Sequence, residues 1–399
     1  MNYQSRRNQL MSQMKDNSCM ILFSGVAPKR SADEQYPFVV NRNFYYLTGI
    51  KEPNLVLVLN KKDTSELLFI EESDELYEKW VGKKISKAEA ETVSGIKEIQ
   101  YTDKFYKWLK GQAITEWYLD LEEDQFNQAE TLAKEMEQAL EGNVMDCYPM
   151  ITKLRSVKSE EEVNEIKEAI KITQEGIENI VKELAPNKRE SQFEAAFDYI
   201  LKSYNVDHAF PTIAASGKNA CTLHYVTNNE FAQNNDLVLF DLGATHKLYC
   251  ADISRTFPVS GKFTERQKEI YQIVLDAQTE MIAAVKPGIT MKELNQVIVD
   301  FYGERLKEIG LIQTKEEVSK YYYHGVSHSL GLDTHDVGLS REEPLVAGNV
   351  ITAEPGLYIA EEGIGIRIED DILVTEDGHI NLSSGILKTV AEIEKAMKR

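Results

Sequence analysis

The stretch DLVLFDLGATHKLYCADISRTF, residues 236–257, contains two β-rich runs joined by a short polar turn. Apolar residues flank Asp241 on both sides, so this acid is not expected to be freely solvated. If the turn centres on His246 and Lys247, antiparallel pairing places Asp241 opposite Asp252. Two like charges that face each other across a hairpin repel, which predicts a positive charge between them.

A second stretch, ITAEPGLYIAEEGIGIRIEDD at residues 351–371, repeats this arrangement. A turn at residues 361–362 sets Glu354 opposite Glu369. Both registers are expectations, because a proline in the first strand cannot donate to the ladder and either hairpin can carry a bulge. Each hairpin nevertheless brings two carboxylates from apolar strands to one point.

Between these hairpins lies HGVSHSLGLDTHDVG, residues 324–338, with three of the seven histidines of the chain. The spacing of His324 and His328 would suit a zinc-binding helix, but the glutamate of an H-E-x-x-H motif is missing and glycines interrupt the segment. Acids in an acidic protein also meet by chance on exposed strands. Four carboxylates on two similar hairpins beside a histidine cluster instead favour a metal site.

Oxygen-rich ligation with one nitrogen suits manganese, iron(II) or cobalt, and zinc is an alternative. Shared carboxylates predict two ions about 3.5–4 Å apart, an arrangement that activates water for hydrolysis.

The overall charge limits the partners. The chain has 399 residues, with 45 basic and 65 acidic side chains and a net charge of −20, which argues against nucleic acid and against an anionic membrane surface. Its 42% hydrophobic and 28% charged residues are typical of a globular protein long enough for two domains.

The cysteines at positions 19, 147, 221 and 250 have no regular spacing, so they are expected to be buried thiols rather than disulfides or a zinc site. The N-terminus is polar and lacks the apolar region of a signal peptide, and no apolar run is long enough to cross a bilayer. A cytoplasmic location is therefore expected.

The first 150 residues alternate β-branched or aromatic runs with polar helical ones, which predicts an α/β domain over residues 1–155. Strands are predicted at 19–25, 43–50, 54–60, 66–71 and 116–121, and helices at 3–16 and 125–140.

The charged segment at residues 152–162 is the best domain boundary, and it leads into a periodic helix that a capping box starts at Ser159. From there the same order of elements occurs twice, two helices and then strands, with capping boxes also at Thr264 and Thr290. This predicts an α+β domain of two similar halves over residues 156–399, with a site at their junction.

The quoted motifs occur in the order found in the metallopeptidases of the pita-bread fold, which include methionine aminopeptidase, prolidase and aminopeptidase P. This resemblance spans about residues 205–375. The segment RSADEQYPFVVNRNFYYLTGIKEPNLVLVLN, residues 30–60, resembles the N-terminal domain of aminopeptidase P. Methionine aminopeptidases lack that domain, and prolidases have a more divergent one. The resemblance thus predicts an N-terminal α/β domain followed by a catalytic pita-bread domain of two similar halves.

The resemblance implies a complete set of five ligands for two divalent ions, with Mn²⁺ favoured. Asp241 is expected to bind one ion, His328 and Glu354 the other, and Asp252 and Glu369 to bridge them. Glu354 is also expected to act as the general base.

The resemblance also assigns the remaining histidines of these motifs. His224 resembles a residue that hydrogen-bonds the substrate or the tetrahedral intermediate, and His335 one that contacts the scissile carbonyl. His324 is expected to line a pocket for proline. For His208, His246 and His379 a structural or surface role is expected.

Two further residues are assigned from their strand positions. Arg367 lies two residues before Glu369 and shares its face, so it is expected to orient that carboxylate and to offset the acids, unless it is a surface arginine. Tyr358 lies on the same strand face as Glu354 and is expected to wall the proline pocket, unless it is plain core.

The implied function is that of a Xaa-Pro aminopeptidase, which releases the N-terminal residue from peptides with proline in second position. The closest alternative is prolidase, which cuts Xaa-Pro dipeptides. A non-catalytic binding protein of the same fold is a third alternative, although such proteins have lost ligands. Peptides are the expected partners, and a homodimer or homotetramer is the expected assembly.

Overall fold

The structure is a computed structural model that describes residues 1–122 and 128–398. The chain divides into two compact units, Met1–Arg155 and Ser156–Arg399. Each unit has its own sheets and helices, so each is described separately.

The first unit is built on one mixed sheet of six strands in the order β4-β3-β2-β1-β5-β6. The strands are β1 (Ser18–Phe23), β2 (Val56–Asn60), β3 (Ser65–Ile70), β4 (Glu98–Tyr101), β5 (Glu116–Leu119) and β6 (Asn143–Asp146). The pairs β1–β2 and β2–β3 are antiparallel, while the other three neighbouring pairs are parallel. The predicted α/β class is confirmed, and four predicted strands overlap β1, β2, β3 and β5.

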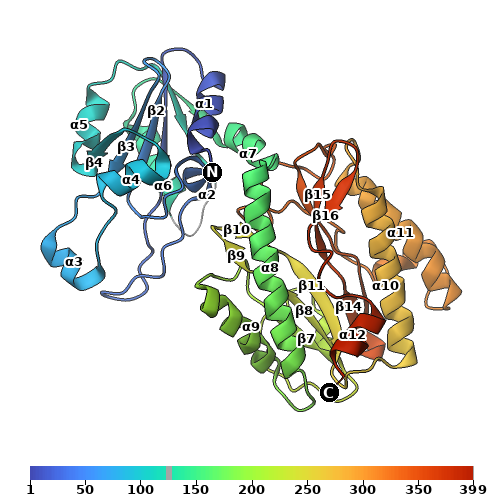
Figure 1. Cartoon of the computed structure of the whole chain (residues 1–399). Coiled ribbons are helices and arrows are strands. Elements are labelled where there is room, and N and C mark those ends of the chain that lie inside the picture. The colour runs from blue at the N-terminus through green and yellow to red at the C-terminus, as the bar shows by residue number, and fades with distance from the viewer. Residues whose placement is uncertain (123–127, 399) are drawn as a thin grey trace. The chain divides into compact units, whose positions relative to one another are not determined.

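Helices lie on both faces of this sheet, whereas α3 lies apart from it (Figure 1). The helices of this unit are α1 (Tyr3–Gln13), α2 (Arg42–Thr48), α3 (Glu75–Val81), α4 (Lys87–Ser94), α5 (Phe105–Lys110), α6 (Ala129–Ala139) and α7 (Tyr148–Ser156), with a 3₁₀ turn η1 (Thr102–Lys104). Alternate strand residues face opposite sides. Ile21 and Phe69 point into a core formed with Phe105 of α5 and Met136 of α6, which closes one face.

The predicted strand at residues 43–50 is wrong, because this segment forms α2. Asn41 caps the helix by accepting from Phe44 N at 2.8 Å, and Gly49 ends it with a positive φ of 73°. Every residue from Asn43 to Thr48 is buried, so the helix has no exposed polar face and shows no helical periodicity in the sequence. Part of another prediction, the start of the 125–140 helix, falls on residues 125–127, outside the described residues.

The second unit repeats one order of elements, as predicted. Its first half contains α8 (Glu160–Glu183), α9 (Glu190–Tyr204), β7 (Ile213–Ser216), η2 (Gly217–Cys221), β8 (Leu237–Leu242), β9 (Thr245–His246), β10 (Tyr249–Cys250) and β11 (Ile253–Pro258). Its second half contains α10 (Glu265–Ala284), α11 (Met291–Glu308), η3 (Lys315–Lys320), β12 (Val350–Ala353), β13 (Gly356–Ile359), η4 (Ala360–Glu362), β14 (Ile364–Arg367), β15 (Asp370–Val374) and β16 (His379–Asn381), followed by α12 (Val390–Ala396).

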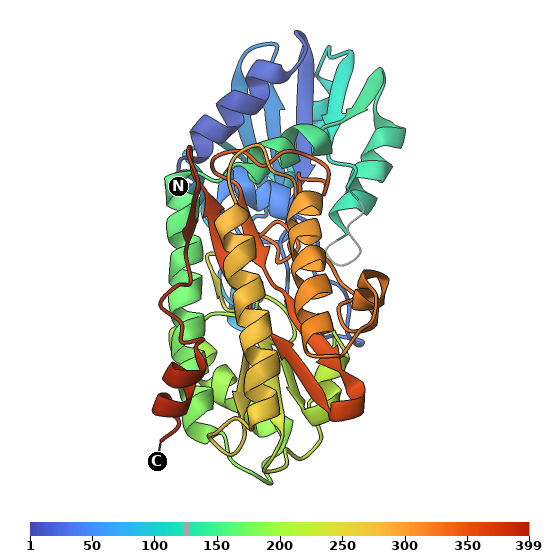
Figure 2. The same cartoon turned by 90° about the vertical axis from the view of Figure 1, so that its right-hand side faces the viewer.

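The strands of this unit lie between the two helix pairs (Figures 1 and 2). Sheets β11-β8-β7 and β12-β15-β16 come from the first and second half, with the short pairs β10-β9 and β13-β14 beside them. The capping boxes predicted at Ser159, Thr264 and Thr290 start α8, α10 and α11. Two helix pairs around strands therefore confirm the predicted α+β unit of two similar halves.

Within residues 1–122 and 128–398, no helix is both long and apolar enough to cross a membrane. All four cysteines are free thiols; Cys19, Cys147 and Cys250 are buried, whereas Cys221 is partly exposed.

Candidate metal centre and active site

The first acidic hairpin has a different register from the predicted one. Asp241 on β8 faces Ser254 on β11, not Asp252. The turn lies at Lys247 and Leu248, whose positive φ angles of 45° and 68° are typical of a primed two-residue hairpin turn. The error is two residues, and the side-chain period of a strand is also two, so Asp252 keeps the face that Asp241 uses. The carboxylates are diagonal neighbours rather than direct partners.

The second hairpin has the predicted register. Gly356 faces Arg367 in the β13–β14 pair, and Ala353 faces Asp370 in the β12–β15 pair. The two short ladders share one register, and Glu354 and Glu369 occupy the gap between them. They therefore lie across from each other, as predicted.

His328 lies between carboxylates of both hairpins. Its Nε2 is 3.4 Å from Asp252 Oδ2 and 3.5 Å from Glu354 Oε1. One donor atom each of Asp252, His328 and Glu369 lies within 4.8 Å of the others. His328 Nδ1 is 3.0 Å from Ser329 O, which leaves Nε2 to face the acids.

Burial and crowding make these carboxylates hard to ionise without a cation. Burial, with the charges of Glu369 and Asp241 nearby, raises the pKa of Asp252 well above its usual value. Burial and the neighbouring Glu354 and Asp241 do the same to the pKa of Glu369. Burial raises the pKa of Glu354 to about 8, although Arg367 opposes the shift. The centre therefore has more negative charge than its own side chains can offset.

Two observations fit divalent cations at this point. Asp241 Oδ1 is buried and has no hydrogen-bond partner among the described residues. Burial also lowers the pKa of His328 to about 4, so the imidazole is neutral at pH 7 and can donate a lone pair. Carboxylate oxygens with one imidazole nitrogen are a donor set for manganese, iron or cobalt.

Arg367 is the buried cation beside the acids. Its Nη2 is 2.6 Å from Asp241 Oδ2, and its Nε donates to Ser254 Oγ at 2.8 Å. Ser254 Oγ in turn donates to Glu369 Oε2 at 2.7 Å. Arg367 thus holds Asp241 directly and Glu369 through a hydroxyl. The sequence analysis missed Ser254, because only the true register places it opposite Asp241.

Tyr358 joins Arg367 to His324. The Tyr358 hydroxyl accepts from Arg367 Nη1 at 3.0 Å and lies 2.8 Å from His324 Nε2. His324 Nδ1 lies 2.7 Å from Gly325 O and acts as the donor there, so Nε2 accepts from the hydroxyl. Burial and the charge of Arg367 lower the pKa of His324 to about 4, which keeps this ring neutral. Tyr358 is 2% exposed and forms the buried wall of this corner.

His335 and His224 complete the group of candidate residues. The rings of His328 and His335 are 4.3 Å apart between centroids. Burial lowers the pKa of His335, and the charge of His224 contributes. His224 follows η2 and is exposed. Its charge also contributes to the lowered pKa of His324. These interactions link His335 and His224 to the other candidate residues.

The remaining three histidines contact residues that are not among the candidate site residues. His208 Nε2 is 3.0 Å from Asp198, and His246 Nδ1 is 2.7 Å from Glu165. His379 Nδ1 is 2.9 Å from Val285 O.

Two further acids near the centre were missed by the sequence analysis. Asp371 is fully buried and accepts from Asp252 N at 3.2 Å. Asp336, next to His335, pairs with Lys158 at 2.9 Å, and both side chains are only 1% exposed. Neither contact follows from local spacing, since the partners are far apart in the sequence.

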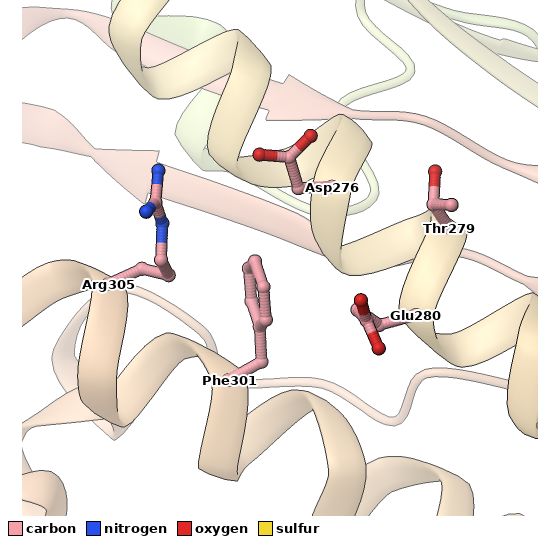
Figure 3. A pocket seen from close by; sticks show the side chains of 5 residues that line it. All are labelled: Asp276, Thr279, Glu280, Phe301 and Arg305. Atoms are coloured by element: carbon pink, nitrogen blue, oxygen red, sulfur yellow. The ribbon is translucent and has the colours of Figure 1, made fainter.

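A shallow pocket of about 200 Å³ lies between α10 and α11 (Figure 3). Its lining residues are Asp276, Thr279, Glu280, Phe301 and Arg305. None of them belongs to the carboxylate centre, so this pocket is separate from the candidate site.

The sequence matches two family models. Metallopeptidase family M24 matches residues 164–376, and the aminopeptidase P N-terminal domain matches residues 3–116. The chain belongs to metallopeptidase family M24. It is a metal-dependent hydrolase with the pita-bread fold that the resemblance predicted, preceded by an aminopeptidase P-type domain.

Full-length relatives place the chain more narrowly, among the Xaa-Pro aminopeptidases of this family. A Xaa-Pro aminopeptidase from Haemophilus influenzae is 35% identical and covers 99% of this chain and 96% of its own length. The Xaa-Pro aminopeptidase from Escherichia coli is 34% identical, and the match covers 99% of this chain and 97% of the relative.

Solved structures agree over the same length. A Bacillus anthracis protein assigned as an aminopeptidase P is 50% identical, with a TM-score of 0.95 and coverages of 99% and 97%. Escherichia coli aminopeptidase P with the inhibitor Pro-Leu is 33% identical, with a TM-score of 0.92 and the same coverages. Both domains of the Xaa-Pro aminopeptidases are therefore present in one chain here.

Proposed function

We propose that this chain releases the N-terminal residue from peptides with proline in second position, and that five of its side chains hold two divalent ions for this reaction. The observation that carries the proposal is the convergence of Asp241, Asp252, His328, Glu354 and Glu369. The full-length similarity to Xaa-Pro aminopeptidases supports the substrate class. Residues 1–155 are assigned to the N-terminal domain and residues 156–399 to the catalytic domain.

In this proposal Asp241 would hold one ion, His328 and Glu354 would hold the other, and Asp252 and Glu369 would be shared by both. Mn²⁺ is the proposed native metal, and Co²⁺, Fe²⁺ and Zn²⁺ have the same kind of donor preference. When bound, the two ions supply an activated water and polarise the carbonyl of the scissile bond.

The protein side chains handle the proton and the substrate. Glu354 accepts the proton of the attacking water and passes it to the proline nitrogen as the C–N bond breaks. His335 contacts the scissile carbonyl, and His224 hydrogen-bonds the substrate. Because His335 has a lowered pKa, its ring is neutral at pH 7 and can both donate and accept a hydrogen bond.

The proline ring binds against His324 and Tyr358 in this proposal. Both are close to Arg367, which holds the Tyr358 hydroxyl in place. A buried aromatic wall with a neutral imidazole suits an apolar ring that offers no N–H. Arg367 therefore supports the substrate pocket and the metal ligands together.

The alternative is prolidase activity, and substrate length separates the two. Mn²⁺-loaded enzyme is expected to cleave Ala-Pro-Ala, with release of alanine followed by mass spectrometry. Cleavage of the dipeptide Ala-Pro alone would instead establish a prolidase.

A non-catalytic role is tested with one ligand variant. Asp252→Asn keeps the size of the side chain but weakens a bridging ligand, so hydrolysis is expected to fall by several orders of magnitude. Unchanged hydrolysis in this variant, or fewer than about one bound ion per chain in the wild type where two are needed, would contradict the proposal.

The proposed assembly is a homodimer or a homotetramer, which analytical ultracentrifugation of the full chain can test. We also propose a cytoplasmic location, which agrees with four free thiols, since secreted proteins tend to form disulfides.

A further inference from the structure

Tyr323 is a half-exposed aromatic residue directly before His324. Its side chain is 46% exposed. Its ring packs on the ring of Tyr358, with centroids 5.2 Å apart and an angle of 40° between the planes. A half-exposed ring that rests on a buried wall of the candidate proline pocket is placed to touch a ligand that extends out of that pocket.

The hydroxyl of Tyr323 holds this ring in position. It donates to Cys221 O at 2.6 Å. Cys221 is the last residue of η2, three residues before His224, so the bond ties the segment of His324 to the segment of His224. A ring fixed at both its face and its hydroxyl loses little conformational entropy when it contacts a ligand.

Tyr323 packs against the edge of an apolar cluster through Tyr358. Tyr358 belongs to a buried cluster with Ala220 and Leu239, and the partly buried Leu223 and Tyr225 pack against it. Contacts run from Asp241 through Arg367 to Tyr358 and then to Tyr323. Exposure rises along this path from 2% at Tyr358 to 46% at Tyr323.

We propose that Tyr323 determines specificity by contacting the residue that follows proline, and that it favours a large apolar side chain there. This inference rests on the proposed Xaa-Pro aminopeptidase function. With the scissile bond at the acids and proline against His324 and Tyr358, the chain beyond proline must leave towards solvent. The exposed aromatic face next to both pocket residues is that of Tyr323.

The test compares Ala-Pro-Phe with Ala-Pro-Gly as substrates of the Mn²⁺-loaded enzyme. Wild type is expected to prefer Ala-Pro-Phe, and Tyr323→Ala to reduce the ratio of the two kcat/KM values about tenfold, mainly through KM. Tyr323→Phe keeps the ring and is expected to keep the preference. Tyr199→Ala on α9 is the matched control, since this tyrosine is 68% exposed and its removal is expected to leave the ratio unchanged.

Binding provides a second readout. The dipeptides Pro-Phe and Pro-Gly, measured by calorimetry, are expected to differ in affinity for wild type and to differ much less for Tyr323→Ala. If the alanine variant does not fold, Tyr323→Gln takes its place, because it has no aromatic face but fills more of the space of the ring.

The outcomes separate this inference from the proposed function. If wild type cleaves both tripeptides and the ratio is the same in Tyr323→Ala, the inference is overturned and the proposed function stands. If wild type cleaves neither tripeptide, both are overturned.

Discussion

Arg367 and Asp241 form a largely buried ion pair, with Nη2 2.6 Å from Oδ2, in which an arginine of the second half neutralises an acid of the first. The same guanidinium also reaches Ser254 and Tyr358. One cation thus connects the metal ligands to the substrate pocket.

Arg367→Met is therefore expected to impair both stability and catalysis. Breaking a buried pair costs about 3–5 kcal/mol, because the remaining charge has no partner. We expect a loss of this size in urea unfolding of the metal-free protein, and a fall in kcat/KM of about a hundredfold or more. Arg266→Met is the control, since Arg266 pairs with Glu362 where both side chains are about one third exposed, and such solvent-accessible pairs contribute about 0–1 kcal/mol. Equal losses in both variants would contradict the assigned role.

Removal of the metal is expected to destabilise the protein. A ligand that binds only the folded state stabilises it by about 2.7 kcal/mol at a hundred times its Kd. Calorimetry is expected to show a lower Tm after chelation and recovery with Mn²⁺. A Tm that stays constant after complete removal of the ions would contradict a metal site in the folded carboxylate cluster.

The stability of the metal-free protein is expected to depend on pH in a defined direction. The pKa of Glu354 is raised to about 8 in the folded chain, against about 4.3 in an unfolded one. The protonated form is therefore favoured by folding, and this contribution is present below about pH 4 and lost as pH rises through about 8. Between these limits this one group lowers the free energy of unfolding by up to about 1.4 kcal/mol per pH unit.

Urea unfolding of chelated protein at pH 6 and pH 8.5 measures this effect. Glu354→Gln is expected to reduce the difference, because the amide does not titrate. Metal-free wild type that is as stable at pH 8.5 as at pH 6 would contradict the crowding of these acids.

Gly365→Ala is expected to move the segment that leads to His224. A Cβ at Gly365 would lie 2.4 Å from Ala220 O, which is a backbone atom, so one of the two segments must shift. Overpacking of this kind costs about 1–3 kcal/mol, and we also expect kcat/KM to fall. Gly378→Ala is the matched control, because a Cβ there meets nothing within 4 Å. If the two substitutions have equal effects on activity, η2 does not position His224.

Lys158→Met is expected to disturb the loop of His335. The pair with Asp336 is almost fully buried, so loss of the lysine charge is expected to cost about 3–5 kcal/mol. We expect kcat to fall more than KM rises, because His335 is assigned to the scissile carbonyl. Lys292→Met, which removes an exposed pair with Glu342, is expected to change neither value.

The carboxylates of the centre were predictable because strands alternate with a period of two. An error of two residues in the first hairpin left Asp252 on the correct face, and the second hairpin had the predicted register. The strand predicted at residues 43–50 was wrong for the opposite reason. A helix that is buried on all sides has no alternation of polar and apolar residues from which its type could be predicted.

The sequence by itself determined which strands carry the acids and that the acids converge, because hairpin pairing joins residues that are near one another along the chain. Only the tertiary structure decided what holds them. Arg367 contacts Asp241 from 126 positions away, and Lys158 contacts Asp336 from 178. Tyr323 reaches Cys221 across 102 positions. Such contacts depend on how the two halves pack, and packing between distant segments leaves no local pattern in the sequence.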